Sequence, residues 1–206
     1  MKNKVSSSKH FLTPIQGIKI LKNSHPDIRK LKRDFIIPQE FGYKIWDSTY
    51  PLINYLKSNI KKRNFKSIEI GCGFGIISIF LKKYFNARPL CIDFDSNVKP
   101  YLELYEKYND IKLKKEIISF KNLKLTTLNQ YDLLTGNDIC YSEDLLESLT
   151  VLLKRIKRSK LREIIIGDPV RWPFEDLLKI VAGMNFKKTI IYNNEYIRVL
   201  HIYNKI

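Results

Sequence analysis

The sequence is poor in the residue that builds disulfides and structural zinc sites. Only three cysteines, Cys72, Cys91 and Cys140, occur in 206 residues, and no two of them form a CxxC pair. Thiols spaced this widely fit a reducing compartment, and they argue against disulfides and against a zinc site. We therefore expect a cytoplasmic protein with no bound metal.

Long apolar runs are also missing. No segment approaches the roughly 18 uninterrupted apolar residues of a membrane span. The first thirty residues lack the apolar block of a secretory signal, so we expect a soluble protein without a membrane partner. Residues 1–26 contain no acidic residue, which leaves import into an organelle open. Because 44% of the residues are hydrophobic, the chain has enough apolar material for one folded domain.

Acidic residues are outnumbered, and the formal net charge is +16. Residues 1–66 hold 15 basic and 4 acidic side chains, so they supply a surplus of 11 of those 16 charges. Clustered cations bind phosphates, which makes nucleic acid a candidate partner of the N-terminal region. Lysines outnumber arginines by 28 to 9, however, although arginine binds phosphate better. An A/T-rich coding bias would produce the same excess of lysine without selection for phosphate contacts. Both interpretations stay open.

The periodicity divides the chain into two parts. Residues 1–40 mix basic runs with prolines and show no sustained period, so we expect a basic, irregular or partly helical N-terminal extension. From residue 41 to 206, strand-like and helix-like segments alternate. The predicted strands cover residues 67–71, 89–93, 112–119, 131–140, 161–167, 186–192 and 195–203, and the predicted helices begin near Tyr50 and cover 76–84, 97–108, 142–158 and 173–183.

This alternation predicts an α/β domain with a Rossmann-like, seven-stranded and mostly parallel sheet, covered by helices on both faces. The last two predicted strands are joined by Asn193-Asn194. Asparagines tolerate the positive φ of a tight turn, so the sheet should end in a C-terminal antiparallel hairpin.

A glycine-rich turn follows the first predicted strand of the domain. The segment Glu69-Ile-Gly-Cys-Gly-Phe-Gly75 has the spacing GxGxG, whereas a dinucleotide fingerprint is GxGxxG and would need glycine where Ile76 stands. Asp93 ends the next strand, 22 residues after Gly71, where a carboxylate can accept hydrogen bonds from both ribose hydroxyls of an adenosine. Asp95 competes for this role, and a turn without any ligand is the alternative for the glycines.

With Asp93, this segment resembles the seven-strand class I methyltransferases that use S-adenosylmethionine (SAM). Within that class, Asp138-Ile-Cys-Tyr141 resembles the DxxY segment of the protein lysine methyltransferases. Gly167-Asp-Pro-Val-Arg171 is similar to the GDPxR segment of the subgroup that contains the electron-transfer-flavoprotein β-subunit lysine methyltransferase. Trp46 resembles the tryptophan that precedes the first strand there.

The resemblance implies a SAM site and assigns its residues. The implied cofactor-binding residues are Trp46, Glu69, Gly71, Cys72, Gly73, Gly75, Asp93, Phe120 and Asn137. Phe120 would pack against the adenine, and Asn137 would contact the cofactor through its backbone. Trp46 and Phe120 could equally be plain core residues. Cys72 is expected to pack inside the turn, since no histidine is placed to activate its thiol.

The candidate catalytic residues are Asp138, Tyr141 and Asp168. Ligands of an open α/β sheet bind beyond the carboxyl ends of the strands, where Asp138 and Asp168 stand. Asp138 could orient an amine, and Tyr141 could line its channel. Alternatively, Asp138 or Ser142 caps the following helix. Arg171 could simply pair with Asp168.

We therefore expect a SAM-dependent methyltransferase that methylates a lysine side chain of a protein partner. An RNA methyltransferase is the runner-up because of the basic N-terminal region, although base amino-group methyltransferases resemble an NPPY or DPPY segment where this chain has Asn137-Asp-Ile-Cys-Tyr141. A small-molecule N-methyltransferase and a non-enzymatic scaffold that keeps the cofactor fold are further alternatives.

Overall fold

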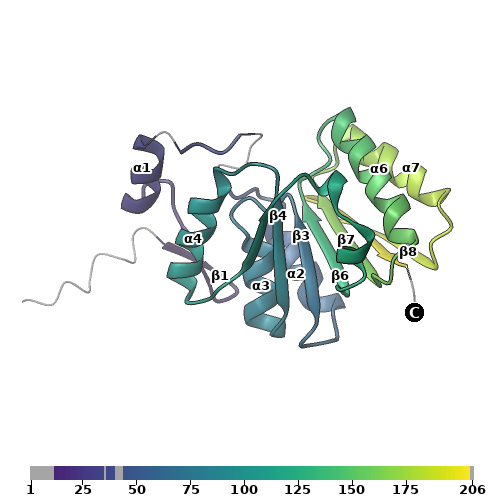
Figure 1. Ribbon diagram of the computed structural model, residues 1–206, viewed down its shortest axis with the longest axis horizontal. Coiled ribbons are helices and arrows are strands. Elements are labelled where there is room, and N and C mark those ends of the chain that lie inside the picture. The colour runs from purple at the N-terminus through teal and green to yellow at the C-terminus, as the bar shows by residue number, and fades with distance from the viewer. Residues whose placement is uncertain (1–11, 35, 40–43, 205–206) are drawn as a thin grey trace, which may run out of the picture.

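The computed structural model describes residues 12–34, 36–39 and 44–204. Its centre is a seven-stranded sheet with the order β5-β4-β3-β6-β7-β9-β8, which confirms the predicted fold class (Figure 1). The strands are β3 (Lys66–Ile70), β4 (Arg88–Asp93), β5 (Lys114–Ile117), β6 (Leu133–Asn137), β7 (Glu163–Asp168), β8 (Lys188–Asn193) and β9 (Arg198–Tyr203). The strands from β3 to β7 are parallel, and β9 runs antiparallel to β7 and to β8.

Helices cover both faces of this sheet (Figure 1). The helices are α2 (Thr49–Asn59), α3 (Ile76–Phe85) and α4 (Val98–Asn109) on one face, and α5 (Leu125–Leu128), α6 (Glu143–Lys157) and α7 (Trp172–Ala182) on the other. Two apolar clusters result, one for each face. Neighbouring residues of β7 show the alternation, because Ile165 joins the first cluster while Ile164 and Ile166 join the second.

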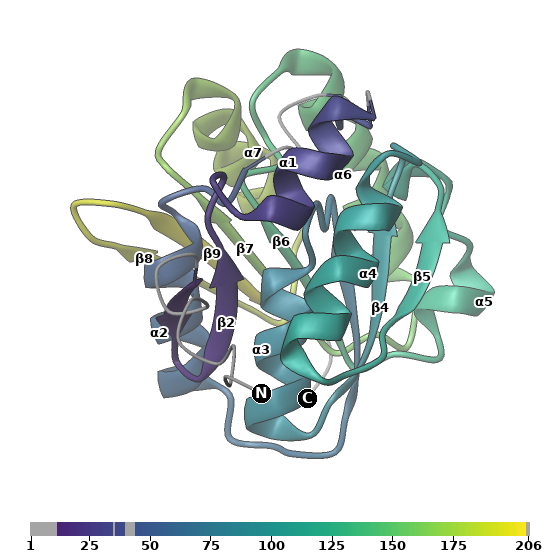
Figure 2. The same ribbon diagram turned by 90° about the vertical axis from the view of Figure 1, so that its left-hand side faces the viewer.

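The N-terminal part is partly helical, as the sequence allowed, but it is not an irregular extension. It forms a two-stranded antiparallel sheet from β1 (Leu12–Ile15) and β2 (Ile18–Leu21), followed by α1 (Pro26–Arg33). The strand β2 contacts α3 and α4, and α1 contacts α4; Figure 2 shows β2 beside α3, with α1 above it. Ile18 and Ile28 are buried in the same apolar cluster as these helices, so this segment contributes to the core.

Tyrosines of α4 explain why this segment packs where it does. The hydroxyl of Tyr105 donates to the carbonyl of Leu21 at 3.3 Å, and that of Tyr108 donates to the Asp27 carboxylate at 2.8 Å. Sequence periodicity could not reveal these contacts, because each joins residues more than 80 positions apart. The short apolar pieces of the segment are stabilised by a helix that lies far along the chain.

Two local features also differ from the sequence analysis. The turn between β8 and β9 is not a two-residue turn at Asn193-Asn194, because β9 begins only at Arg198 and neither asparagine has a positive φ. Instead, the Asn194 side chain accepts hydrogen bonds from the backbone N–H groups of Tyr196 and Ile197 at 2.9 and 2.8 Å. Between β5 and β6 the chain forms a 3₁₀ turn at Phe120–Asn122 and the short α5, which the sequence pattern did not indicate.

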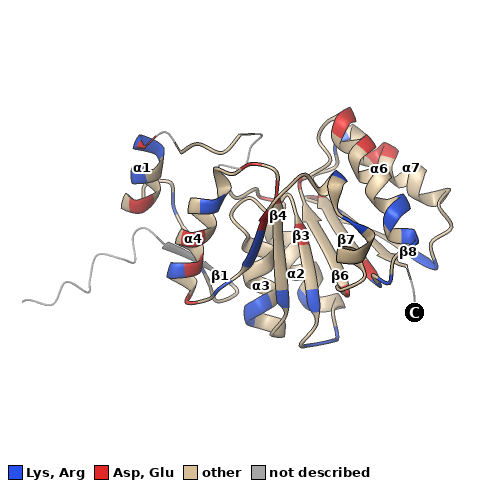
Figure 3. Cartoon of the chain, in the orientation of Figure 1, with Lys and Arg blue, Asp and Glu red and all other residues tan. Residues whose placement is uncertain are grey.

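Charge is distributed over many elements. Figure 3 shows lysine and arginine positions on α1, α3, α4 and α6, so basic residues occur well beyond the N-terminal region. Within the described ranges, no helix is long and apolar enough to cross a membrane.

Candidate active site

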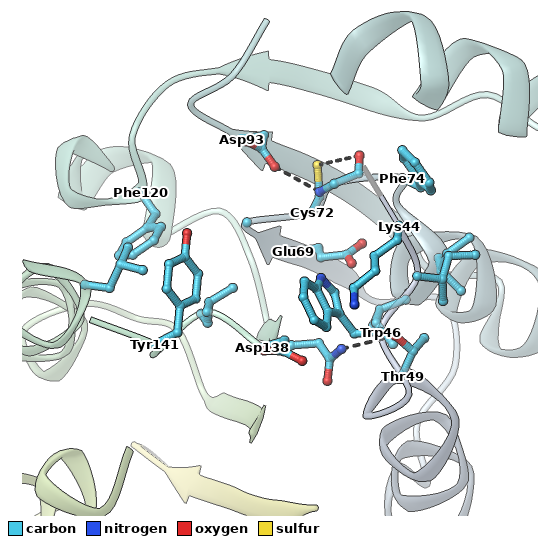
Figure 4. A pocket seen from close by; sticks show the side chains of 18 of the residues that line it. Lys44, Trp46, Thr49, Glu69, Cys72, Phe74, Asp93, Phe120, Asp138 and Tyr141 are labelled. Atoms are coloured by element: carbon cyan, nitrogen blue, oxygen red, sulfur yellow. Dashed lines mark hydrogen bonds between the residues drawn. The ribbon is translucent and has the colours of Figure 1, made fainter. Parts of the chain in front are cut away.

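A cavity opens at the carboxyl ends of β3, β4 and β6 (Figure 4). The chain builds the sheet from β3 outward through β4 and β5, and then returns to add β6 and β7 on the other side of β3, so the cavity lies at this switch point. This is where ligands of open α/β sheets bind. The residues that line it are Gln39, Lys44, Ile45, Trp46, Thr49, Glu69, Gly71, Cys72, Gly73, Phe74, Ile76, Ile77, Asp93, Phe94, Phe120, Asn137, Asp138, Ile139, Tyr141, Leu145 and Arg171.

The glycine-rich turn forms the floor of the cavity. Gly71 has a φ of +58°, and a Cβ atom there would lie 2.6 Å from Cγ2 of Ile139. Gly75 has a φ of +70° and begins α3, and a Cβ atom there would lie 2.6 Å from Leu102. Both the backbone conformation and the lack of space therefore require glycine. Gly71 lines the cavity, whereas Gly75 shapes the turn from behind it.

Asp93 holds the turn in place and faces the cavity. One of its carboxylate oxygens accepts the Gly73 N–H at 2.9 Å, and the other accepts the Asp95 N–H at 3.1 Å. Asp95 does not line the cavity, since its carboxylate accepts the backbone N–H groups of Gln39 and Asn97. Of the two candidate carboxylates, Asp93 is therefore the one placed to bind a ribose.

Glu69 is a carboxylate within the buried strand β3. Its side chain accepts the N–H of Ser78, in the first turn of α3, at 2.7 Å. Burial nevertheless raises the pKa of Glu69 to about 7, because the loss of hydration outweighs the hydrogen bonds that the carboxylate accepts from the first turn of α3. A cationic ligand in the cavity would favour ionisation, and SAM, which the sequence resemblance implies, carries both an ammonium and a sulfonium group.

Asp138 lies in an ion-pair network that joins three segments. It follows β6 with a φ of +62°. This backbone conformation is uncommon outside glycine, and residues that adopt it are often found at functional sites. Its carboxylate pairs with the Arg171 guanidinium and accepts a hydrogen bond from the Ser48 hydroxyl at 2.9 Å. Arg171 also contacts Asp168 at 3.1 Å, so Arg171 pairs with both aspartates and not only with Asp168 as the sequence suggested.

Asp168 lies behind this network. It is fully buried and does not line the cavity, so the structure does not bring it to the substrate side where we expected it. Its carboxylate accepts the Arg171 backbone N–H at 2.9 Å, and burial raises its pKa to about 6. We conclude that Asp168 positions Arg171. The alternative that Asp138 caps α6 is also excluded, because Ser142 is the cap and accepts the Leu145 N–H at 3.4 Å.

The start of α2 closes the cavity on the side of β6. The side-chain amide of Asn137 donates to the hydroxyls of Ser48 and Thr49 at 3.0 and 3.1 Å. Sequence analysis did not select these two hydroxyl residues, and only the resemblance around the nearby Trp46 pointed to their segment. They fix the residue before Asp138, so they help to set the position of its carboxylate.

Aromatic rings surround the open part of the cavity. Figure 4 shows the rings of Trp46, Phe120 and Tyr141 around the same space. The Arg171 guanidinium lies 5.5 Å from the centre of the Tyr141 ring, and the Lys44 amine lies 3.6 Å from the centre of the Trp46 ring. The aromatic residues that we proposed near the cofactor thus line one cavity.

Cys72 also lines this cavity but is a poor nucleophile. It is buried, and burial raises the pKa of its thiol well above the ordinary value. The thiol therefore stays protonated at neutral pH. This agrees with the expectation that Cys72 is a packing residue of the turn.

Comparison with known proteins identifies the family to which a chain with this cavity belongs. The family described as lysine methyltransferase matches residues 30–171. The chain belongs to this family. None of the curated proteins matches the chain. The protein is thus a SAM-dependent methyltransferase.

Solved structures show the same fold at low sequence identity. A ribosomal protein L11 methylase from Lactobacillus delbrueckii subsp. bulgaricus is 17% identical, with a TM-score of 0.62 over 81% of this chain and 80% of that one. An rRNA methylase from Streptococcus thermophilus is 11% identical, with a TM-score of 0.60 over 78% and 98%. SMU.1697c from Streptococcus mutans, in complex with the demethylated cofactor SAH, is 14% identical, with a TM-score of 0.60 over 78% and 99%.

The residues of this methyltransferase fit SAM on structural grounds. The cavity offers a carboxylate at Asp93 for the ribose, an aromatic ring at Phe120 for the adenine, and a turn at Gly71 that has no room for a side chain. Glu69 adds an ionisable carboxylate for a cationic ligand. No group of histidine, cysteine and acidic residues within the described part of the chain is arranged to hold a metal ion.

Proposed function

We propose that this methyltransferase transfers a methyl group from SAM to the side-chain nitrogen of a lysine in a protein. The description of its family supports this acceptor, and so does the wall of the cavity from Asp138 to Tyr141. The observation that carries the proposal is the position of Asp138. Its carboxylate faces the cavity whose floor is the glycine-rich turn, so one space can receive both a cofactor and an amine.

The acceptor amine must lose a proton before it attacks, because an ordinary lysine has a pKa near ~10.4. The apolar side chains of Ile139 and Leu145 line the cavity and would remove water from an entering ammonium, which lowers its pKa. The Tyr141 ring can contact the cation before its proton leaves. These residues thus favour the neutral amine at the place where it reacts.

Asp138 would orient the amine. An ionised carboxylate offers about four acceptor positions, and Arg171 and Ser48 use two of them. The remaining capacity suffices for one N–H of the substrate. When bound, SAM would supply the methyl group to an amine that has already given its proton to solvent, and it would leave as SAH. The main contribution of the chain is alignment and exclusion of water.

A nucleic-acid acceptor is the second candidate, favoured by the +16 net charge and its concentration in the first 66 residues. The chemistry of the cavity supports it less. Asp138 would repel a phosphate-bearing substrate unless nearby cations compensated, and Arg171 is already shared between two aspartates.

Incubation of the purified protein with methyl-labelled SAM and a cell lysate tests the proposal. We expect label in material that protease destroys and nuclease leaves intact, and hydrolysis should release methylated lysine. Asp144→Asn is the matched control for an Asp138→Asn variant. It changes an exposed carboxylate on α6, outside the cavity, and should label the lysate as well as wild type does. Label confined to nuclease-sensitive material would refute the protein acceptor and support RNA, and label in a small molecule would refute both.

A further inference from the structure

An exposed lysine lines the cofactor cavity and has no acidic partner among the described residues. Lys44 stands just before α2 and lines the cavity, with its Nζ 3.6 Å from the centre of the Trp46 ring. Figure 4 shows this amine beside Trp46. Such a contact between an ammonium and an aromatic face fixes the direction of an otherwise flexible side chain.

The other charged side chains that line the cavity already have partners within the protein. Arg171, the other cation of the lining, is paired with Asp138 and Asp168. Asp93 accepts two backbone N–H groups of its own turn. Glu69 accepts the backbone N–H of Ser78. Of the ion pairs within the described ranges, none includes Lys44.

The cofactor brings one anionic group into this cavity. SAM carries a sulfonium, an ammonium and a carboxylate at its methionine end. A carboxylate buried in a mostly apolar and acidic cavity needs a cation or several donors, or its desolvation weakens binding. Since β3 lies between β4 and β6, a cofactor whose ribose is held by Asp93 after β4 reaches with its other end toward β6 and the segment before α2. Lys44 stands on that segment.

We propose that Lys44 binds the carboxylate of the methionine part of SAM and thereby makes the enzyme select the intact cofactor over forms that lack this group. Trp46 positions the amine. The proposal depends on SAM as the cofactor and is independent of which acceptor is methylated. It adds to the site a residue that no motif in the sequence indicated.

A ligand that differs from SAM only in the carboxylate gives the sharpest test. Decarboxylated SAM keeps the adenosine, the sulfonium and the amine. Calorimetry should show that wild type binds decarboxylated SAM about 10- to 100-fold more weakly than SAM, the range for losing a charge-assisted hydrogen bond. Lys44→Met should lose a similar factor for SAM but bind the two ligands with nearly equal affinity, so that a cycle of two proteins and two ligands isolates the pair.

Two further variants complete the design. Lys44→Arg keeps the cation and should retain most of the preference for SAM. Lys112→Met removes a lysine whose side chain is 92% exposed and lies outside the cavity, and it should bind both ligands as wild type does. If Lys44→Met weakened SAM and decarboxylated SAM equally, or left both unchanged, the assignment would be wrong. A methyl group found on Lys44 itself after incubation with SAM would also overturn it, because the amine would then be an acceptor.

Discussion

The guanidinium of Arg171 is paired with the carboxylate of Asp138, which ties the loop after β7 to the loop after β6. Arg171 in turn is held from behind by the buried Asp168 at 3.1 Å. Asp138 thus lines the cavity with a carboxylate that is fixed by Arg171, while Asp168 contacts Arg171 and does not line the cavity. The two strand-end aspartates, which look equivalent in the sequence, have different surroundings and different tasks.

This arrangement predicts the effect of removing the charge of Asp138. Asp138→Asn keeps the size of the side chain and an acceptor for Ser48 but weakens the pair with Arg171. Turnover should fall by about 10- to 1,000-fold, while the affinity for SAM stays close to that of wild type. Rates with labelled SAM and calorimetry check both parts, with Asp144→Asn as the control. Full activity of Asp138→Asn would show that the carboxylate does not orient the acceptor.

The ribose assignment can be tested with the neighbouring aspartates. Asp93→Ala should weaken SAM binding by roughly 1.5 to 3 kcal/mol, the scale of hydrogen bonds to a charged acceptor. Asp95→Ala should weaken it less, because Asp95 does not line the cavity and its carboxylate is used by the backbone N–H groups of Gln39 and Asn97. Calorimetry measures both. If the order of the two effects were reversed, Asp95 would be the ribose ligand.

The buried carboxylate of Glu69 predicts a pH dependence of stability. Burial raises its pKa from 4.5 to about 7, so between these values the unfolded chain is ionised while the folded protein keeps the proton. The free energy of unfolding should therefore decrease as the pH rises through this window. Glu69→Gln cannot ionise and should lose this contribution.

Urea unfolding of the cofactor-free protein at pH 5 and pH 8 measures the effect. The difference in unfolding free energy between wild type and Glu69→Gln should change by up to about 3 kcal/mol, with wild type relatively less stable at the higher pH. Asp168, whose pKa burial raises to about 6, contributes with the same sign in both proteins and cancels. A difference that does not change with pH would mean that Glu69 ionises normally.

The N-terminal segment should matter for stability. Ile18→Ala removes a fully buried side chain and should lower the free energy of unfolding by about 2 to 5 kcal/mol. Lys22→Ala, at an exposed position four residues on, is the control and should have little effect. Deletion of residues 1–35 should lower the melting temperature strongly. A truncated protein that melts like wild type would show that this segment adds little to the stability of the fold.

Sequence alone determined the sheet, because the information is local. Apolar strands alternate with amphipathic helices, and the turn from Gly71 to Gly75 needs residues without a Cβ atom, so both features are visible in short stretches. Asp93 could be selected in the same way, from its distance to that turn. The family resemblance then placed Asp138 and Tyr141 at the cavity.

Tertiary structure decided what depends on contacts between distant residues. The packing of Ile18 against α4, the pairing of Arg171 with two aspartates, and the hydroxyls of Ser48 and Thr49 beside Asn137 all join segments that the folded sheet brings together. Nothing near Asp168 in the sequence distinguishes it from Asp138, because burial is a property of the packed layers. The position of Lys44 in the cavity has the same origin, since only the folded chain lays the segment before α2 across the ends of the strands.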